Sequence, residues 1–158
     1  MFEYDNVLAA CDGGSLDNRE RLSGLPSYPQ YCDKNKGEEI IFLSPLQPDI
    51  ETKLTYRQTG LDEIEIIPSV ETDEDAKRTI HDLLNLNVPK LKNLRGKAIV
   101  GLIFQNPATG DLISVQDAEA LIDAIERKID NVENVGNEYL PEFCTVKLHF
   151  LRLFAGRT

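Results

Sequence analysis

The sequence predicts an α+β fold, a mainly antiparallel sheet with two principal helices packed on one face. Three observations indicate this class. Several short segments have the composition of strands, two longer segments have the apolar spacing of amphipathic helices, and turns rather than strict strand–helix alternation connect the strands. With 158 residues and 41% hydrophobic composition, the chain can bury one core. We therefore expect a single domain over residues 1–158.

The first 37 residues predict a loop-rich N-terminal arm that precedes an α+β core over residues 38–158. Glycines and prolines interrupt this part of the chain at short intervals and break regular structure. Leu25, Tyr28 and Tyr31 still provide apolar anchors. We expect the arm to lie on the domain or on a neighbouring subunit.

Three strands are expected at the start of the core, over residues 39–43, 54–58 and 63–67. Each has the length and the apolar or alternating composition of a strand. Proline follows the first and the third, which ends them.

The first principal helix is expected after Thr72, a residue type suited to the N-cap. Asp73, Glu74 and Asp75 then form an acidic first turn, which the helix dipole favours. An apolar stripe at helical spacing follows, and the helix must end before Pro89.

The second half of the sheet is predicted from one apolar run and one alternating segment. Residues 97–104 are apolar throughout, which indicates a central strand covered on both faces. A turn over residues 106–111, with proline and glycine at turn positions, leads to a short return strand over residues 112–114. Residues 143–150 alternate and are expected to form the last strand.

The second principal helix follows Ser114, which forms a capping box with Asp117. Its apolar residues recur at helical spacing and form one stripe: Ala118, Leu121, Ile122, Ile125, Ile129 and Val132. The opposite face is charged, and Asp123 and Arg127 are spaced for an i,i+4 ion pair.

The negative charge of the chain is concentrated in one segment. Residues 38–75 contain 11 acidic and 2 basic residues, a net charge of −9 out of −10 for the whole chain. Such a field repels nucleic-acid backbones and anionic membranes, and it attracts cations or a basic protein. We therefore expect a basic protein partner and no nucleic acid.

The location is predicted from what the sequence lacks. No apolar run approaches the length of a transmembrane helix, and the N-terminus has no signal-peptide pattern. The three cysteines form no close pair, which suits a reducing compartment. We expect a cytoplasmic protein that does not bind membranes.

The candidate partner-binding residues are carboxylates of the acidic segment: Asp62, Glu63, Glu65, Asp73, Glu74 and Asp75. Their charge favours docking on a basic surface. Their oxygens could also hold a hard divalent cation, although the EF-hand spacing is absent, and the sequence leaves metal binding open. As a plain alternative, they are solvated residues of an acidic helix turn and of the outer face of a strand.

No catalytic or cofactor-binding motif is present. The chain has no glycine-rich phosphate loop and no Gly-x-Ser-x-Gly elbow. Cys144 and His149 would point to opposite faces of the expected last strand, and His81 has no neighbouring ligand. We expect no cofactor and no catalytic residues, and the sequence favours a non-enzymatic role.

The sequence therefore predicts a small acidic protein-interaction module, an inhibitor, adaptor or immunity-type protein, that docks on a basic partner through residues 38–75. The alternative is a structural subunit of a homo-oligomer that assembles through the N-terminal arm. A less favoured alternative is a divalent-metal-dependent hydrolase that uses the carboxylates of residues 62–75.

Overall fold

The computed structural model of the chain describes residues 29–43, 47, 49–60, 62–106, 110–135 and 143–157, with 105, 106 and 131–135 described by their backbone alone. The chain divides into two compact units. Unit 1 consists of Met1–Thr55 and Ile66–Val88, and unit 2 of Tyr56–Glu65 and Pro89–Thr158. The single domain stays a prediction, and most of the expected N-terminal arm, residues 1–28, lies outside the described residues.

The α+β class is confirmed, and the strands of the described ranges form two two-stranded pairs rather than one sheet. Strand β1 (Leu54–Gly60) pairs with β2 (Glu63–Pro68), as two of the predicted strands should. Strand β3 (Phe104–Asn106) pairs antiparallel with β4 (Asp111–Leu112). A return strand is present, but it spans Asp111–Leu112 rather than the predicted residues 112–114. Gly110 adopts the positive φ, 75°, that its turn position requires.

Unit 1 is organised around α4 (Glu74–Arg78) and the π-helical turn η2 (Thr79–Leu83) that continues it. The buried apolar side chains of this unit come from several segments: Tyr31, Leu43, Ala76, Ile80, Leu83 and Val88. The short helix α2 (Asp33–Lys36) is tied to η2, because the side-chain amide of Asn35 donates to the carbonyls of Asp82 and Leu83. Helix α3 (Ile50–Lys53) leads directly into β1.

The first principal helix is present, but its cap was predicted one residue too early. Asp73, not Thr72, is the N-cap of α4, since its Oδ1 accepts a hydrogen bond from the backbone N–H of Ala76 at 2.9 Å. An Asp carboxylate caps a helix more effectively than a Thr hydroxyl. The apolar stripe is confirmed, with Ile80 and Leu83 buried.

The strand predicted over residues 39–43 is wrong. These residues form no strand, and Ile40 is 83% exposed while Leu43 is buried. A strand needs a neighbour that completes its backbone hydrogen bonds. Within the described part of the chain, β1 and β2 pair only with each other, so residues 39–43 have no strand neighbour.

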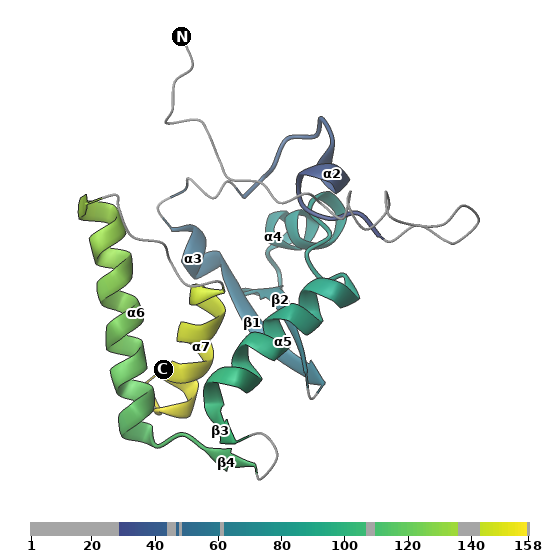
Figure 1. Cartoon of the computed structure of the whole chain (residues 1–158). Coiled ribbons are helices and arrows are strands. Elements are labelled where there is room, and N and C mark those ends of the chain that lie inside the picture. Colours follow the sequence, from purple (N-terminus) through teal and green to yellow (C-terminus); the bar gives the residue numbers. More distant parts are fainter. Residues whose placement is uncertain are drawn as a thin grey trace. The chain divides into compact units, whose positions relative to one another are not determined.

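Unit 2 is a helical assembly in which α7 (Cys144–Phe154) packs on α6 (Val115–Val135) and on α5 (Pro89–Ile103). Helices α6 and α7 run antiparallel side by side, and the β3–β4 hairpin connects α5 to α6 (Figure 1). The ion pair between Glu126 and Arg152, at 2.7 Å, joins α6 to α7.

The predicted central strand over residues 97–104 is wrong, because α5 includes its first seven residues and only Phe104 begins a strand. A continuous apolar run does not distinguish a buried strand from a buried helix. Pro89 occupies the first helical position, where proline is favoured, so the expected linker over residues 90–95 is helical as well. The buried residues of α5 then recur at helical spacing.

The last predicted strand, residues 143–150, is also wrong, because these residues form the start of α7. The helix packs against two core clusters at once. Cys144, Leu148 and Leu151 belong to the cluster formed with α6, whereas Val146 and Phe150 belong to a cluster with α5 and β2. Two apolar stripes on one helix imitate the alternation of a strand in the sequence.

The second principal helix, α6, is confirmed with its capping box. The Ser114 hydroxyl accepts a hydrogen bond from the backbone N–H of Asp117 at 3.0 Å. Ala118, Ile122 and Ile125 are buried against α7, as the stripe predicts. The predicted Asp123–Arg127 ion pair is wrong: Arg127 donates to the Asp123 backbone carbonyl, and the Asp123 carboxylate lies 3.7 Å from an Arg157 nitrogen.

Candidate functional site

The structure divides the predicted binding residues between the two units. Asp62, Glu63 and Glu65 belong to unit 2, and Asp73, Glu74 and Asp75 belong to unit 1. The acidic segment is divided unequally. Its parts in unit 1 contain eight acidic residues and one basic residue, a net charge of −7, and its part in unit 2 has a net charge of −2.

The carboxylates of β2 are neutralised by basic side chains of unit 2. Glu63 Oε2 lies 3.0 Å from the Lys92 ammonium of α5. Glu65 accepts a hydrogen bond from Arg57 Nε at 2.9 Å, and its side chain is only 16% exposed. A basic partner would compete with Lys92 and Arg57 for these carboxylates. Asp62 is exposed and makes no ion pair with a described residue.

Several acidic residues of unit 1 lie at or beside α4. Glu39 lies 3.7 Å from Arg78, the last residue of α4, and the backbone carbonyl of Val70 accepts a hydrogen bond from Asp73 at its beginning. A helix of five residues is about 8 Å long, so residues 38–40 and 70–75 lie near opposite ends of a short segment. We refer to these residues as the α4 acidic region.

Several carboxylates of the α4 acidic region form no ion pair with a described residue. Glu38, Glu71 and Asp75 are exposed and form no ion pair there. Asp73 is used as a cap, and Glu74 pairs with Lys77 at 2.8 Å. Exposed ion pairs of that kind contribute at most about 1 kcal/mol, so Glu74 stays accessible to a partner.

Two large apolar side chains of the α4 acidic region are exposed as well. Ile40 is 83% exposed and Val70 is 61% exposed. Nearby, the Arg78 guanidinium carbon lies 4.7 Å from the ring centroid of Phe42, which fixes the segment after Ile40 on α4. The α4 acidic region therefore combines exposed carboxylates with two exposed apolar side chains.

The described residues offer no cluster of three or more His, Cys, Asp or Glu side chains that could hold a metal ion. Cys144 packs in the core against α6. His149 contacts other residues, since its ring lies 5.4 Å from that of Tyr56 and 5.1 Å from that of Phe150. Burial lowers the pKa of His149 from its ordinary value of 6.5, against a weaker opposing effect of a hydrogen bond with the Tyr56 backbone.

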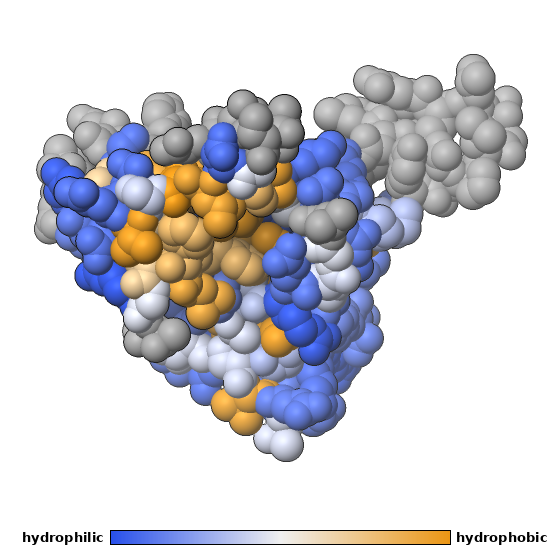
Figure 2. Space-filling view, turned by 90° about the horizontal axis from the view of Figure 1, so that it is seen from below, coloured by the Kyte–Doolittle hydropathy of each residue, from blue (hydrophilic) through white to orange (hydrophobic). Residues whose placement is uncertain are grey.

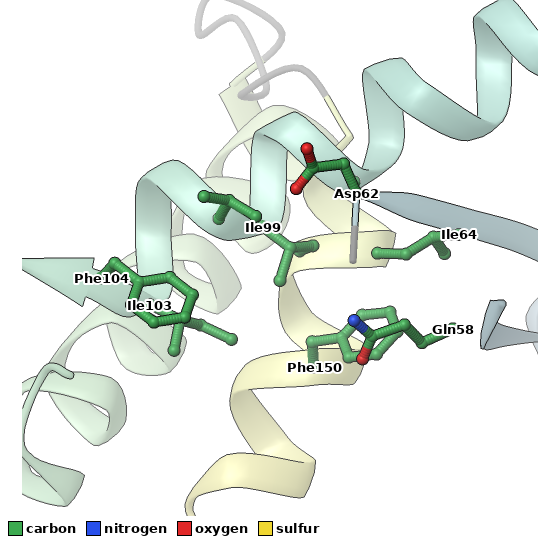
Figure 3. Close-up of a pocket in the computed structure, with 9 residues that line it drawn as sticks. Gln58, Asp62, Ile64, Ile99, Ile103, Phe104 and Phe150 are labelled. Carbon is green, nitrogen blue, oxygen red and sulfur yellow. The ribbon is translucent and has the colours of Figure 1, made fainter. Parts of the chain in front are cut away.

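Unit 2 contains a cavity of about 440 Å³ that the sequence did not predict. Figure 3 shows Ile99, Ile103, Phe104 and Phe150 around it, with Asp62 at one end and Gln58 beside Phe150. The remaining lining residues are Ile64, Gly96 and Val100. The cavity is therefore mostly apolar, with a carboxylate and an amide at its edge.

Gly96 fixes the position of Asp62 at this cavity. A Cβ atom at Gly96 would overlap with the backbone carbonyl of Asp62, so α5 and the β1–β2 turn are in direct contact there. Only glycine permits so close an approach. The contact places the Asp62 carboxylate next to the apolar face of α5.

The sequence did not reveal the cavity because most of its apolar lining comes from residues 97–104 and 143–150, which were wrongly predicted as strands. As helices, α5 and α7 place Ile99, Ile103 and Phe150 around one space. The sequence feature that could have revealed helix α5 was Pro89, because proline is favoured at the first position of a helix. Figure 2 shows apolar side chains gathered in a broad exposed area, with hydrophilic side chains along part of its border, and such areas are typical of binding surfaces.

No family model, no curated protein and no solved structure matches this chain. No helix in the described ranges has both the length and the apolar character needed to cross a membrane.

Proposed function

We propose that this protein is a small protein-interaction module that docks on a basic partner through the α4 acidic region of unit 1. The observation that carries the proposal is the set of exposed carboxylates, Glu38, Glu71 and Asp75, that form no ion pair with a described residue. A partner with lysines or arginines at matching positions would gain attraction without breaking ion pairs within this protein.

The exposed apolar side chains support the same proposal. Charge alone steers association and gives specificity, but apolar contacts hold a complex together. Ile40 and Val70 are exposed within the α4 acidic region and would be buried by a partner that covers it. The Glu63 and Glu65 carboxylates of unit 2, which the sequence placed in the binding surface, are not part of this proposal because they pair with Lys92 and Arg57.

The wider expectations from the sequence remain part of this proposal. The partner is a basic protein rather than a nucleic acid or a membrane, since the region repels phosphate groups. The module acts in the cytoplasm. Homo-oligomers formed through the N-terminal arm are compatible with it, because α4 lies outside residues 1–37.

The test is affinity capture of the partner with the full chain, followed by titration of the purified partner. The decisive variant is Glu71→Lys, and Glu119→Lys on α6 is its control. Both residues are exposed, and both substitutions raise the net charge by two. We expect Glu71→Lys, and more strongly Glu38→Lys/Glu71→Lys, to slow association about tenfold or more at low salt.

The control should bind as the wild type does, and added salt should weaken wild-type binding more than binding of the double variant. Equal affinities of Glu71→Lys, Glu119→Lys and the wild type would remove the α4 acidic region from the interface. Ile40→Ala and Val70→Ala then report on the apolar contribution through the dissociation rate.

A further inference from the structure

We propose that the cavity of unit 2 is a binding site for a small cationic amphiphile, an amine on an apolar body. This site lies outside the α4 acidic region and does not depend on the function proposed for unit 1. Three properties of the cavity support this site: its size, the chemistry of its walls, and the charge at its edge.

The size suits a small molecule rather than one side chain of a partner. At about 440 Å³ the cavity falls within the range of small-molecule sites, roughly 300–1,000 Å³. All its lining residues belong to unit 2, so the site is complete within that unit. A ligand with an aromatic ring and a short alkyl chain would fill most of it.

The walls require an apolar body. Ile99, Val100 and Ile103 of α5 form one side, and Phe150 of α7 and Ile64 of β2 contribute others. Figure 3 shows the two phenylalanine rings, Phe104 and Phe150, directed to the same open space. Water in such a space lacks hydrogen-bond partners along these walls, so its displacement by an apolar ligand is favourable.

The charge at the edge selects a cation. Three carboxylates lie in and beside the β1–β2 turn, and two of them, Glu63 and Glu65, are neutralised by Lys92 and Arg57. Asp62 lines the cavity and forms no ion pair with any residue that the structure describes. Next to an apolar surface, a carboxylate attracts an ammonium group more strongly than in open water.

These features together define the ligand. Its apolar part contacts Ile99, Ile103 and the phenylalanine rings, and its ammonium group donates to the Asp62 carboxylate. A carboxylate ligand of the same shape would meet repulsion from Asp62, and an alcohol would gain only a neutral hydrogen bond. The site therefore discriminates by the charge of the polar group.

The experiment is calorimetric titration of the full chain with three probes of one shape: 4-phenylbutylamine, 4-phenylbutanol and 4-phenylbutyrate. For ligands of this size we expect dissociation constants on the order of 0.1–1 mM. The amine should bind about three- to tenfold more tightly than the alcohol, and the carboxylate should bind most weakly.

Two substitutions test the charge. Asp62→Asn keeps the shape of the side chain and should make amine and alcohol bind equally. Asp75→Asn makes the same change of net charge at a residue that does not line the cavity and should leave the preference intact. Equal binding of the three probes by the wild type, or a preference that survives Asp62→Asn, would overturn the proposal.

Val100→Trp tests the location, because Val100 lines the cavity but is not a member of either core cluster of unit 2. The indole should occupy the space and weaken all three probes at least tenfold; undiminished binding would overturn the proposal. If this variant does not fold, amine-induced chemical-shift changes in the wild type decide instead. Chemical-shift changes at Ile99, Ile103 and Phe150 would support the proposed site, and changes elsewhere would overturn the proposal.

Discussion

The two units of this protein differ in net charge and in the ion pairs that their carboxylates form. Unit 1 contains 15 acidic and 7 basic residues, a net charge of −8, whereas unit 2 contains 12 and 10, a net charge of −2. In unit 2 the carboxylates of Glu63, Glu65 and Glu126 each pair with a basic side chain on another element or strand. In unit 1 several carboxylates at α4 remain exposed without such a partner among the described residues.

This difference shows that acidity in a sequence has two structural outcomes. Where a basic residue lies on a neighbouring element or strand, the carboxylate forms an ion pair within the unit. Where none does, the negative field persists outside the molecule and can attract a partner. Unit 1 therefore offers a surface that recognises charge, and unit 2 offers a cavity that recognises an apolar shape with one charge at its edge.

The largest expected effect concerns the contact that forms the cavity edge in unit 2. Gly96→Ala should reduce the free energy of unfolding by about 2–3 kcal/mol, because the added Cβ overlaps with the Asp62 carbonyl and forces α5 away from the turn. Gly101→Ala on the same helix meets open space and should stabilise it by about 0.5–1 kcal/mol. Urea unfolding measures both, and equal effects would contradict the close contact.

A smaller change in unfolding free energy distinguishes the carboxylate that caps α4 from one that makes no such contact in unit 1. Asp73→Ala removes the N-cap of α4 and should cost about 1 kcal/mol of unfolding free energy. Asp75→Ala removes only a charge near the helix N-terminus and should cost less than about 0.5 kcal/mol. Thermal unfolding of the two variants checks the order; a larger loss from Asp75→Ala would mean that this carboxylate is not free for a partner.

Helices α6 and α7 show which parts of the fold could be predicted from the sequence and which could not. Helix α6 was predicted correctly because the capping box of Ser114 and Asp117 and one clear apolar stripe agree. Helix α7 was not, because its packing against two clusters produces two stripes whose sum alternates like a strand. Leu151, which breaks that alternation and is fully buried, was the informative exception.

The candidate sites, like the fold, could be predicted from the sequence only in part. The location of the negative charge followed from composition, and Asp73 to Asp75 do lie at a helix beginning. The pairing of Glu63 with Lys92 could not follow from sequence, because it joins residues 29 positions apart through the packing of α5 on β2. The cavity depended on helices that the sequence pattern concealed.

The smallest expected effect is the pH dependence contributed by unit 2. Because burial lowers the pKa of His149 below 6.5 in the folded state, the unfolded chain takes up this proton first as the pH falls. The stabilising contribution is complete above pH 6.5 and is lost as the pH decreases through 6.5 toward the folded-state pKa. His149→Gln should flatten the slope of unfolding free energy against pH in that window.

The control for this measurement is His81→Gln, which removes the only other histidine of the chain and lies in unit 1. A slope that is unchanged by His149→Gln would show that His149 is not desolvated beside the rings of Tyr56 and Phe150.

The most decisive measurement for the binding surface of unit 1 is to map where a basic ligand binds. Amide chemical shifts of the full chain would be followed during titration with a lysine-rich peptide. We expect chemical-shift changes at residues 38–40 and 70–75 that disappear at high salt and in the Glu38→Lys/Glu71→Lys variant. Changes confined to unit 2, or changes in unit 1 that persist in this variant, would contradict the proposed binding surface.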